Sequence, residues 1–317
     1  MIVTVTLNAA IDRTLSVPNF QLGQRHRANQ TRTQAGGKGI NIARALKRLD
    51  VPVVATGLAG GRTGVRIVEE LTAEAILNDF VRIAEESRTS TAVLDPTGGT
   101  FTEINEWGPQ VEPDELDVLR EKLAYLSRGA ELVVFAGTLP RGVEPGFYAD
   151  EVRELQRRGI RCVVDTEGEP LRLALEAEPF LVSPNQVEAE SIVGQELYED
   201  EDFVMALDAI SEAGARNVQI TVRTGCYALL REERREHHLY ARSPDVEPVS
   251  TVGAGDVLLA AYVASLYAGK PVDEALRAAV AAGAASTLEI GAGRFDPREA
   301  ARLAPAVELA ELAAAEA

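Results

Sequence analysis

The residues best suited to carry chemistry form a glycine-bearing segment, Ser250 to Asp256, which precedes a long apolar run. The run predicts a helix, whose first turn has unpaired N–H groups and the positive end of the helix dipole. Gly253 and Gly255 have no Cβ, so the backbone there can come close to a ligand. A turn built from Gly253, Ala254 and Gly255 therefore suits the charge that develops on a transferring phosphoryl group.

Asp256 follows this turn directly. A carboxylate at an anion-binding turn does not help to bind an anion, but it can accept a proton from an attacking hydroxyl. The alternative is structural, since Asp256 would also serve as an N-cap on a tight turn. The local sequence leaves both interpretations open.

A second glycine cluster, Gly36-Gly37-Lys38-Gly39, begins another predicted helix and is followed closely by Asn41. It matches neither the phosphate-binding loop G-x-x-x-x-G-K-[ST] nor the dinucleotide motif G-x-G-x-x-G, so both of these nucleotide sites are excluded here. It can still offer backbone donors, an ammonium group and an amide to a hydroxylated ligand. Asp12 follows the first predicted strand, and open α/β sheets bind ligands where strands end.

Asn185 and Glu188 follow the predicted strand 180–185. Three residues apart on a first helical turn, they face one way. They suit a hydrated Mg²⁺, which takes few protein ligands and keeps several waters. A helix capping box is an equally good interpretation.

Apolar strand-like runs alternate with helix-period segments along most of the chain. This order predicts an α/β fold with a mostly parallel sheet covered on both faces. The Ala-rich stretch 254–288 is predicted to be helical, and 297–315 is predicted to be a closing helix. Two polar segments, about 12–34 and 87–107, lack helices and predict antiparallel ribbons that form a lid. The alternative is two surface hairpins without a role. No linker divides the rest, so residues 1–317 are predicted to be one domain.

Composition excludes several classes of function. The 317 residues contain 32 Lys and Arg against 49 Asp and Glu, a net charge of −17. An acidic surface disfavours nucleic acids and anionic membranes as partners. The start of the chain lacks a signal peptide's basic region, and two cysteines provide no disulfide framework, so a cytoplasmic location is expected.

Acid-rich, lysine-poor composition favours a protein that works in concentrated salt. His237 and His238 are expected at the surface, and no metal-ligand spacing is apparent.

Taken together, the motifs resemble those of the PfkB (ribokinase-like) carbohydrate kinases. The segments that carry the resemblance, in order, are TLNAAIDRT, GGKGINIARAL, GTLPRGV, SPNQVE and STVGAGD. The resemblance covers about residues 2–290, and STVGAGD before an apolar helix is its most specific part. The start of the chain, the GGKGIN form and the phrase TEINEWGP are similar to the phosphosugar branch of the family.

The resemblance implies an eight- or nine-stranded Rossmann-type core with a small β-sheet lid, ATP as donor and Mg²⁺ as the required ion. It implies Asp256 as the base and Gly253, Ala254 and Gly255 as the anion hole. The implied sugar ligands are Asp12, Gly37, Lys38 and Asn41, with the lid residues Arg88 and Arg27 as candidate phosphate ligands. Implied nucleotide and Mg²⁺ contacts are Asn185 and Glu188, the metal being held through water, and Thr221, Thr224, Gly225, Thr251, Gly253 and Gly255. A homodimer joined through the lid is also implied.

Two departures from the family pattern affect the nucleotide site. Ser183 stands where a lysine is common. Thr224 and Tyr227 fall where glycines would approach the nucleotide, so this loop departs most from the family pattern.

The expected function is an ATP-dependent phosphosugar kinase that converts fructose 1-phosphate into fructose 1,6-bisphosphate. Tagatose 6-phosphate and fructose 6-phosphate are alternative acceptors, since the motifs do not fix which hydroxyl reacts. A non-catalytic sugar or nucleotide sensor is an alternative of another class, but a sensor has no use for a base at Asp256.

Overall fold

The structure, a computed structural model, describes residues 1–232 and 235–313. Its larger sheet has the strand order β14-β13-β12-β11-β10-β9-β8-β1-β4-β5. In this order the seven strands from β11 through β1 to β5 run parallel, and β11 to β14 are joined by antiparallel pairings. The strands of this sheet are β1 Ile2–Thr6, β4 Val53–Gly60, β5 Leu77–Ile83, β8 Leu132–Ala136, β9 Arg161–Asp165, β10 Leu181–Val182, β11 Val218–Val222, β12 Gly225–Glu232, β13 Arg235–Arg242 and β14 Glu308–Glu311.

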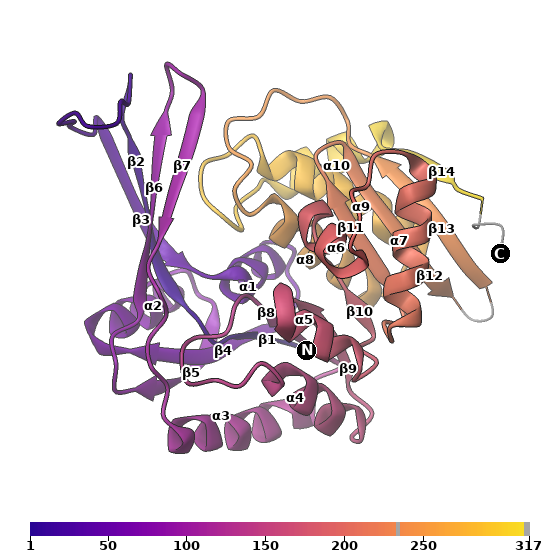
Figure 1. The fold of residues 1–317 in the computed structure, drawn as a ribbon, viewed down its shortest axis with the longest axis horizontal. Helices are drawn as coiled ribbons and strands as arrows, with labels where there is room; N and C mark the ends of the chain where they lie inside the picture. The colour runs from indigo at the N-terminus through magenta and orange to yellow at the C-terminus, as the bar shows by residue number, and fades with distance from the viewer. Residues whose placement is uncertain (233–234, 314–317) are drawn as a thin grey trace.

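Helices cover both faces of this sheet (Figure 1). Alternate side chains of a strand enter opposite layers, so that Ile2 packs in one apolar cluster while Val3 and Val5 pack in the other. One layer contains α1 Lys38–Arg48, α2 Gly61–Ala73, α8 Ala254–Tyr267, α9 Val272–Ser286 and α10 Pro297–Leu303. The other contains α3 Pro113–Leu126, α4 Phe147–Gln156, α5 Gly168–Leu175, α6 Gln186–Val193 and α7 Asp200–Glu212. The short 3-10 helices are η1 Ser127–Gly129 and η2 Ala304–Ala306.

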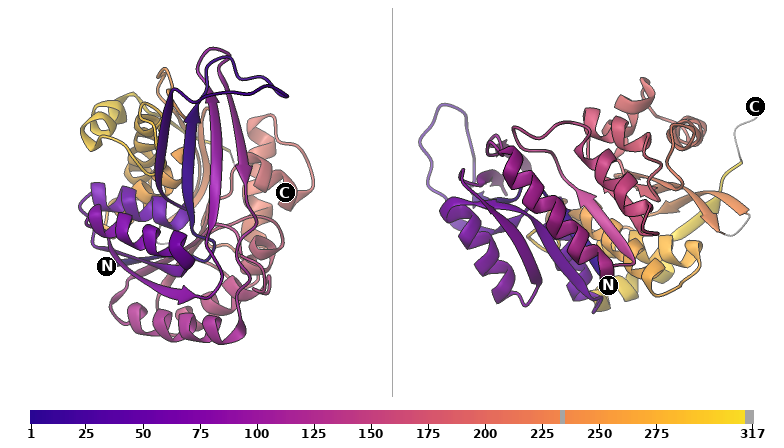
Figure 2. Two further views of the ribbon diagram at one scale, coloured as in Figure 1. Left: turned by 90° about the vertical axis from the view of Figure 1, so that its left-hand side faces the viewer. Right: turned by 90° about the horizontal axis from the view of Figure 1, so that it is seen from below.

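A separate four-stranded sheet stands beside this body and is seen face-on in Figure 2. Its order is β3-β2-β6-β7, from β2 Ala10–Ser16, β3 Gln30–Gly36, β6 Arg88–Asp95 and β7 Thr100–Asn105. Each predicted ribbon is an antiparallel pair, but the two join through β2 and β6, which run parallel. The two segments far apart in sequence therefore form one sheet, called the small sheet below.

Several boundaries differ from the sequence-based expectation. The large sheet has ten strands rather than eight or nine. Of the predicted closing helix 297–315, the first part is confirmed as α10, but the rest is wrong as far as the structure describes it, to residue 313, because Pro305 lies in η2 and the chain then pairs with β13 as β14. The helical stretch 254–288 is two helices, separated where Gly269 has a positive φ and Pro271 caps α9. Across the described residues, no helix is long and apolar enough to cross a membrane.

Candidate active site

A cavity of about 380 Å³ lies between the small sheet and the carboxyl ends of the parallel strands. The small sheet supplies residues from β2, β6 and β7, while the body supplies the starts of α1 and α8 and the residues after β9 and β10. Most of the predicted site residues line it, namely Asp12, Gly37, Lys38, Asn41, Arg88, Asn185, Glu188, Thr221, Thr251, Gly253, Ala254, Gly255 and Asp256. Segments spread over more than 240 residues of sequence thus meet in one place.

The turn at Gly253 opens into this cavity. Gly253 has φ +79 and is the N-cap of α8, and a Cβ there would lie 2.7 Å from the Cβ of Ala292. Among the described residues, no side chain caps this helix. The amide of Ala254 donates to the carbonyl of Thr251 at 3.3 Å, and the amide of Val257 to that of Gly253 at 3.1 Å. The amides of Gly255 and Asp256 lie between these, at the positive end of the helix dipole.

Asp256 lies within the first turn of α8, with 7% of its surface exposed. The N-cap is Gly253, so the interpretation of Asp256 as a capping residue is wrong. Its Oδ2 accepts a hydrogen bond from Asn41 Nδ2 at 2.8 Å. Burial, aided by the nearby charge of Asp165, raises the pKa of Asp256 to about 7, although Lys38 and Asn41 oppose the rise. A carboxylate with such a pKa is suited to exchange protons near neutral pH.

Lys38 is held by two carboxylates. Its Nζ lies 2.7 Å from Asp165 Oδ1 and 3.4 Å from Glu188 Oε1. Burial alone would lower the pKa of Lys38, but these carboxylates outweigh it and hold the pKa above its ordinary value. Lys38 therefore remains a cation inside the cavity. The sequence analysis did not select Asp165, although its place at the end of a predicted strand was the signal that could have found it.

Asp12 and Arg88 face the cavity from the small sheet. Burial raises the pKa of Asp12 to about 6, against the lowering effect of Arg88 and Arg44. A Cβ at Gly36 would lie 2.0 Å from Asp12 Oδ2, so a side chain there would displace this carboxylate from its present position. Arg88 donates to the backbone oxygen of Asn8 at 3.3 Å and to Asn105 at 3.4 Å. Both bonds are long, which leaves the guanidinium able to turn to a ligand.

Asn185 and Glu188 form a capping box at the start of α6, so the structural interpretation of this pair is confirmed. Asn185 Oδ1 accepts from the Glu188 amide at 3.0 Å, and Glu188 Oε2 accepts from the Asn185 amide at 2.8 Å. Burial raises the pKa of Glu188, and the charge of Lys38 opposes this. The second oxygen of Glu188 faces Lys38, so the pair both starts a helix and contributes to the cavity wall.

Three predicted residues lie elsewhere. Arg27 is exposed in the segment between β2 and β3, and it is not among the residues that line the cavity. Thr224 and Gly225, at the turn between β11 and β12, do not line it either. A Cβ at Gly225 would lie 2.0 Å from the carbonyl oxygen of Ala241, so β13 covers this glycine.

His238 also differs from expectation. It is 6% exposed rather than at the surface, and its Nε2 lies 2.7 Å from Asp208 Oδ1. With Glu236, these residues place three potential ligand atoms within 4.8 Å of one another. The expectation that no such group exists is wrong, because the antiparallel strand β13 turns His238 inward against α7.

The fold and the site define a class of protein. Parallel strands between two helical layers end at a cavity that the small sheet adjoins. This cavity combines a buried carboxylate, a lysine and a helix start without a side-chain cap. This combination is suited to phosphoryl transfer to a hydroxyl group.

Comparison with known proteins identifies the family. The sequence profile "pfkB family carbohydrate kinase" matches residues 3–299, and the chain belongs to this family. It is 31% identical over 312 residues to a 1-phosphofructokinase of Rhodobacter capsulatus, covering 98% of each chain. It is 29% identical to a tagatose-6-phosphate kinase of Staphylococcus epidermidis, covering 98% of this chain and 100% of that one. The predicted family and class of enzyme, a phosphotransferase with an alcohol acceptor, are confirmed.

Solved structures agree with this assignment. Phosphofructokinase-2 from Escherichia coli in complex with substrates and products has a TM-score of 0.88 at 30% identity, covering 96% of this chain and 99% of that one. Ribokinase of Arabidopsis thaliana has a TM-score of 0.72 at 20% identity, covering 96% and 98%, and this likeness shows the fold alone. The predicted ribokinase-like fold class is therefore confirmed.

Proposed function

We propose that this protein transfers the γ-phosphoryl group of ATP to a hydroxyl group of a phosphosugar. The best candidate reaction is fructose 1-phosphate plus ATP, giving fructose 1,6-bisphosphate and ADP. The observation that carries the proposal is the convergence of Asp256, Lys38 and Arg88 on one cavity, from three distant segments. Relatives called 1-phosphofructokinase, among them that of Rhodobacter capsulatus, support the choice of acceptor.

Asp256 takes the proton in this proposal. The acceptor oxygen bonds to the γ-phosphorus as the bond to ADP breaks, and Asp256 accepts the proton of the hydroxyl group. The positive end of α8 stabilises the charge on the transferring group through the amides of its first turn. A pKa near 7 leaves a sizeable share of Asp256 ionised at neutral pH while keeping it basic enough to accept the proton.

The phosphate already present on the acceptor requires a local cation, because a net charge of −17 repels anions from the protein as a whole. Arg88 and Lys38 supply positive charge within the cavity. They also line a smaller adjoining cavity of about 130 Å³, together with Asn8 and Thr138. Asn8 Oδ1 is buried without a hydrogen-bond partner among the described residues, which suits it to accept from a ligand. We place the substrate phosphate at Arg88, with Lys38 beside it.

Replacing Arg88 tests this placement. Arg88→Ala should raise the KM for the phosphosugar about tenfold or more, since a charge-assisted hydrogen bond to phosphate is lost, and should change the KM for ATP little. Initial-rate kinetics with each substrate varied in turn provide the measurement. Arg82→Ala, which removes an exposed arginine of the edge strand β5 that lines neither cavity, is the control for net charge. Equal increases in both KM values would contradict a phosphate clamp at Arg88.

The donor side combines the α8 turn with Thr221, Thr251 and the capping pair Asn185 and Glu188. A bound Mg²⁺ would neutralise charge on the phosphates of ATP. The residues present fit an ion held through water, because Asn185 Oδ1 and Glu188 Oε2 already accept backbone hydrogen bonds and Glu188 Oε1 faces Lys38. Asn185 and Glu188 would hold such an ion through its waters, and Lys38 limits how much negative charge the site presents.

The small sheet is proposed to act as a lid and to join two subunits. As a lid it would exclude water, which competes with the sugar for the phosphoryl group. Every residue of β7 is exposed, and Phe101, Ile104 and Trp107 add apolar surface on or after that strand. A homodimer would cover this surface. Light scattering after gel filtration should give twice the monomer mass, and Ile104→Asp should lower it towards that of the monomer.

A coupled assay of ADP release tests the function as a whole. Fructose 1-phosphate, fructose 6-phosphate, tagatose 6-phosphate and unphosphorylated fructose are compared at low and molar KCl. We expect the highest kcat/KM with fructose 1-phosphate, and higher activity in molar KCl if the acidic composition reflects a saline cytoplasm. Higher kcat/KM with tagatose 6-phosphate or fructose 6-phosphate would reassign the acceptor. Binding of sugar phosphate without turnover would instead favour a sensor.

A further inference from the structure

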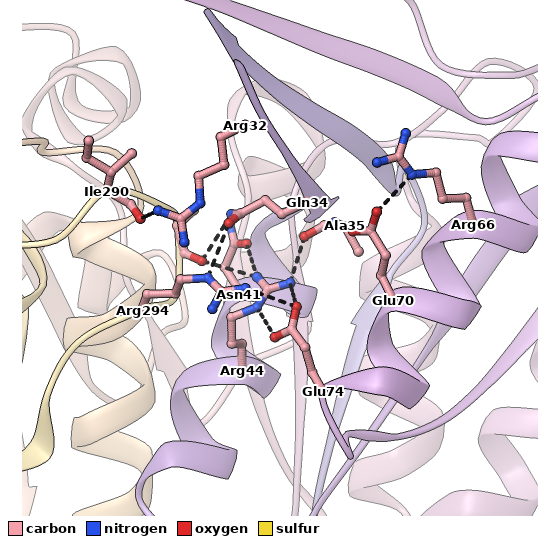
Figure 3. Close-up of polar contacts among 11 residues, drawn as sticks. Arg32, Gln34, Ala35, Asn41, Arg44, Arg66, Glu70, Glu74, Ile290 and Arg294 are labelled. Atoms are coloured by element: carbon pink, nitrogen blue, oxygen red, sulfur yellow. Dashed lines mark hydrogen bonds and ion pairs between the residues drawn. The ribbon is translucent and has the colours of Figure 1, made fainter. Parts of the chain in front are cut away.

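A buried arginine lies directly behind the candidate catalytic carboxylate. Arg44, on the second turn of α1, is only 2% exposed, and it does not line the cavity. Figure 3 shows it at the centre of a polar network between α1, α2, β3 and the segment 290–294. A buried guanidinium is costly unless its donors are all satisfied, so this placement needs a reason.

The network holds Arg44 by its three nitrogens. Nε and Nη2 donate to the two carboxylate oxygens of Glu74, at 2.6 and 3.2 Å. Nη2 also donates to the carbonyl of Ala35 at 2.8 Å, which ties α1 to β3. Nη1 donates to the carbonyl of Ala292 at 3.1 Å and to Asn41 Oδ1 at 3.2 Å. The planar group is therefore fixed in position and orientation.

The contact with Asn41 has a chemical consequence. A guanidinium only donates hydrogen bonds, so the amide atom that faces Arg44 must be the oxygen. The amide nitrogen of Asn41 is then turned to Asp256, and its Nδ2 donates to Oδ2 at 2.8 Å. Without Arg44, the amide could rotate and present its oxygen to Asp256 instead.

We propose that Arg44, held by Glu74, is a positioning residue that fixes which end of the Asn41 amide faces Asp256. The proposal rests on the proposed role of Asp256 as the proton acceptor. An amide N–H facing Asp256 stabilises the ionised carboxylate, whereas an amide oxygen would stabilise its protonated form. The orientation of one side chain thus decides how readily the base is ionised.

Other charged groups near Asp256 also affect how readily its carboxyl group is ionised. Lys38 on α1 favours the ionised form, while Asp165 at the end of β9 and Asp12 on β2 disfavour it, as does burial. Arg44 is hydrogen-bonded to none of these three charged groups, since its partners are Glu74, Asn41 and the carbonyls of Ala35 and Ala292. Arg44 also supports the turn of α8 indirectly, since it holds the carbonyl of Ala292, against which Gly253 packs.

The test compares two substitutions with a matched control. Arg44→Lys keeps the charge but cannot fix the amide with a planar fork, and Glu74→Gln loosens Arg44 without touching the cavity. Arg66→Ala removes a neighbouring ion pair of α2, between Arg66 and Glu70, and Arg66 contacts neither Arg44 nor Asn41 directly (Figure 3). The readout is kcat as a function of pH, measured with thermal unfolding of each variant.

Arg44→Lys should move the acid limb of kcat upward by about one pH unit. That shift lowers kcat about tenfold at pH 6 and leaves it within about twofold at pH 9. Glu74→Gln should produce a smaller shift in the same direction, and Arg66→Ala should produce none. In an Asn41→Ala background, Arg44→Lys should cause no further shift, because no amide remains to be oriented.

Two results would overturn the proposal: an unchanged acid limb in folded Arg44→Lys, or an equal shift in the Asn41→Ala background. If Arg44→Lys does not fold, an unchanged acid limb in Glu74→Gln overturns it. Failure of the proposed function is separate, because it would appear as normal turnover in Asp256→Asn whatever the Arg44 variants do.

Discussion

Two turns of this protein carry glycine at a positive φ and yet have opposite surroundings. Gly253 has φ +79 and Gly225 has φ +152, and the sequence predicts a nucleotide contact at both. Behind Gly253, the chain packs against Ala292, and the following residues face the cavity. At Gly225, strand β13 lies against the position that a side chain would occupy. In both turns a side chain would collide with the protein, with Ala292 at Gly253 and with the backbone of Ala241 at Gly225, but only the residues after Gly253 line a cavity.

The aromatic residues of β12 and β13 explain the difference. Tyr227 stacks between Phe203 and Tyr240, with ring centroids 4.0 and 4.4 Å away. The hydroxyl of Tyr240 donates to Thr224 Oγ1 at 3.0 Å. These contacts fill and fasten the Gly225 turn. A glycine in such a motif therefore predicts close packing, and the side chains around the turn decide whether a ligand can enter.

The largest expected effect comes from the turn that opens. Asp256→Asn should lower kcat roughly 10²-fold or more, with the KM for both substrates little changed, because the proton acceptor is lost while the shape is kept. Steady-state kinetics provide the measurement. Thr224→Ala at the closed turn is the matched control and should keep kcat within about twofold. Near-normal turnover in Asp256→Asn would show that the proton goes to another group.

The same substitution should change how stability depends on pH. The pKa of Asp256 is about 7 in the folded protein against 3.8 for an ordinary aspartate, so between these pH values the folded state binds the additional proton. The free energy of unfolding of the wild type therefore falls as pH rises from about 4 to 7. Asp256→Asn should escape this loss and be the more stable protein at pH 8, with its advantage gone near pH 4. Urea denaturation across this range is the measurement, and parallel curves for both proteins would contradict the pKa.

A crossed pair of alanine substitutions sharpens the contrast between the turns. Gly225→Ala should cost about 2 kcal/mol of stability or more, since the new Cβ would meet Ala241, while the folded fraction keeps its specific activity. Gly255→Ala should keep or slightly raise stability, because a Cβ there has no atom within 4 Å and alanine favours helix. Its activity should fall severalfold as the methyl narrows the cavity. The reverse pattern would show that the two turns have been assigned the wrong way round.

The sequence predicted those parts of the site that short segments define. The start of α8, the glycines before α1 and the α6 cap depend on residues within a few positions of one another, and these were found. The contact of Asp165 with Lys38 spans more than a hundred residues, and the only local sign of Asp165 is its place at the end of a predicted strand. Arg44 depends on its pairing with Glu74 at the end of α2, and no local pattern marks it.

The fold was predictable where apolar runs are long, because such runs, like the motifs of the site, are local features of the sequence. The edge strand β5 was missed because only two of its seven residues are buried, so it lacks the continuous apolar run of an inner strand. The end of the chain was wrong because alanine favours helix locally, whereas Pro305 and the open edge of β13 fix β14. Local preference was overridden at the edges of the sheet, where tertiary pairing decides.

The smallest expected effect tests the closed turn itself. Tyr227 donates to Asp200 Oδ1 at 2.5 Å, a hydrogen bond that ties β12 to the start of α7. Tyr227→Phe keeps the stacked ring and loses only this bond, so stability should fall by about 1 kcal/mol with kinetics unchanged. Asp200→Asn is the matched variant, and the double substitution should cost little more than either alone. If instead Tyr227→Phe raised the KM for ATP, the aromatic stack would belong to the nucleotide site, and the division between an open and a closed turn would fail.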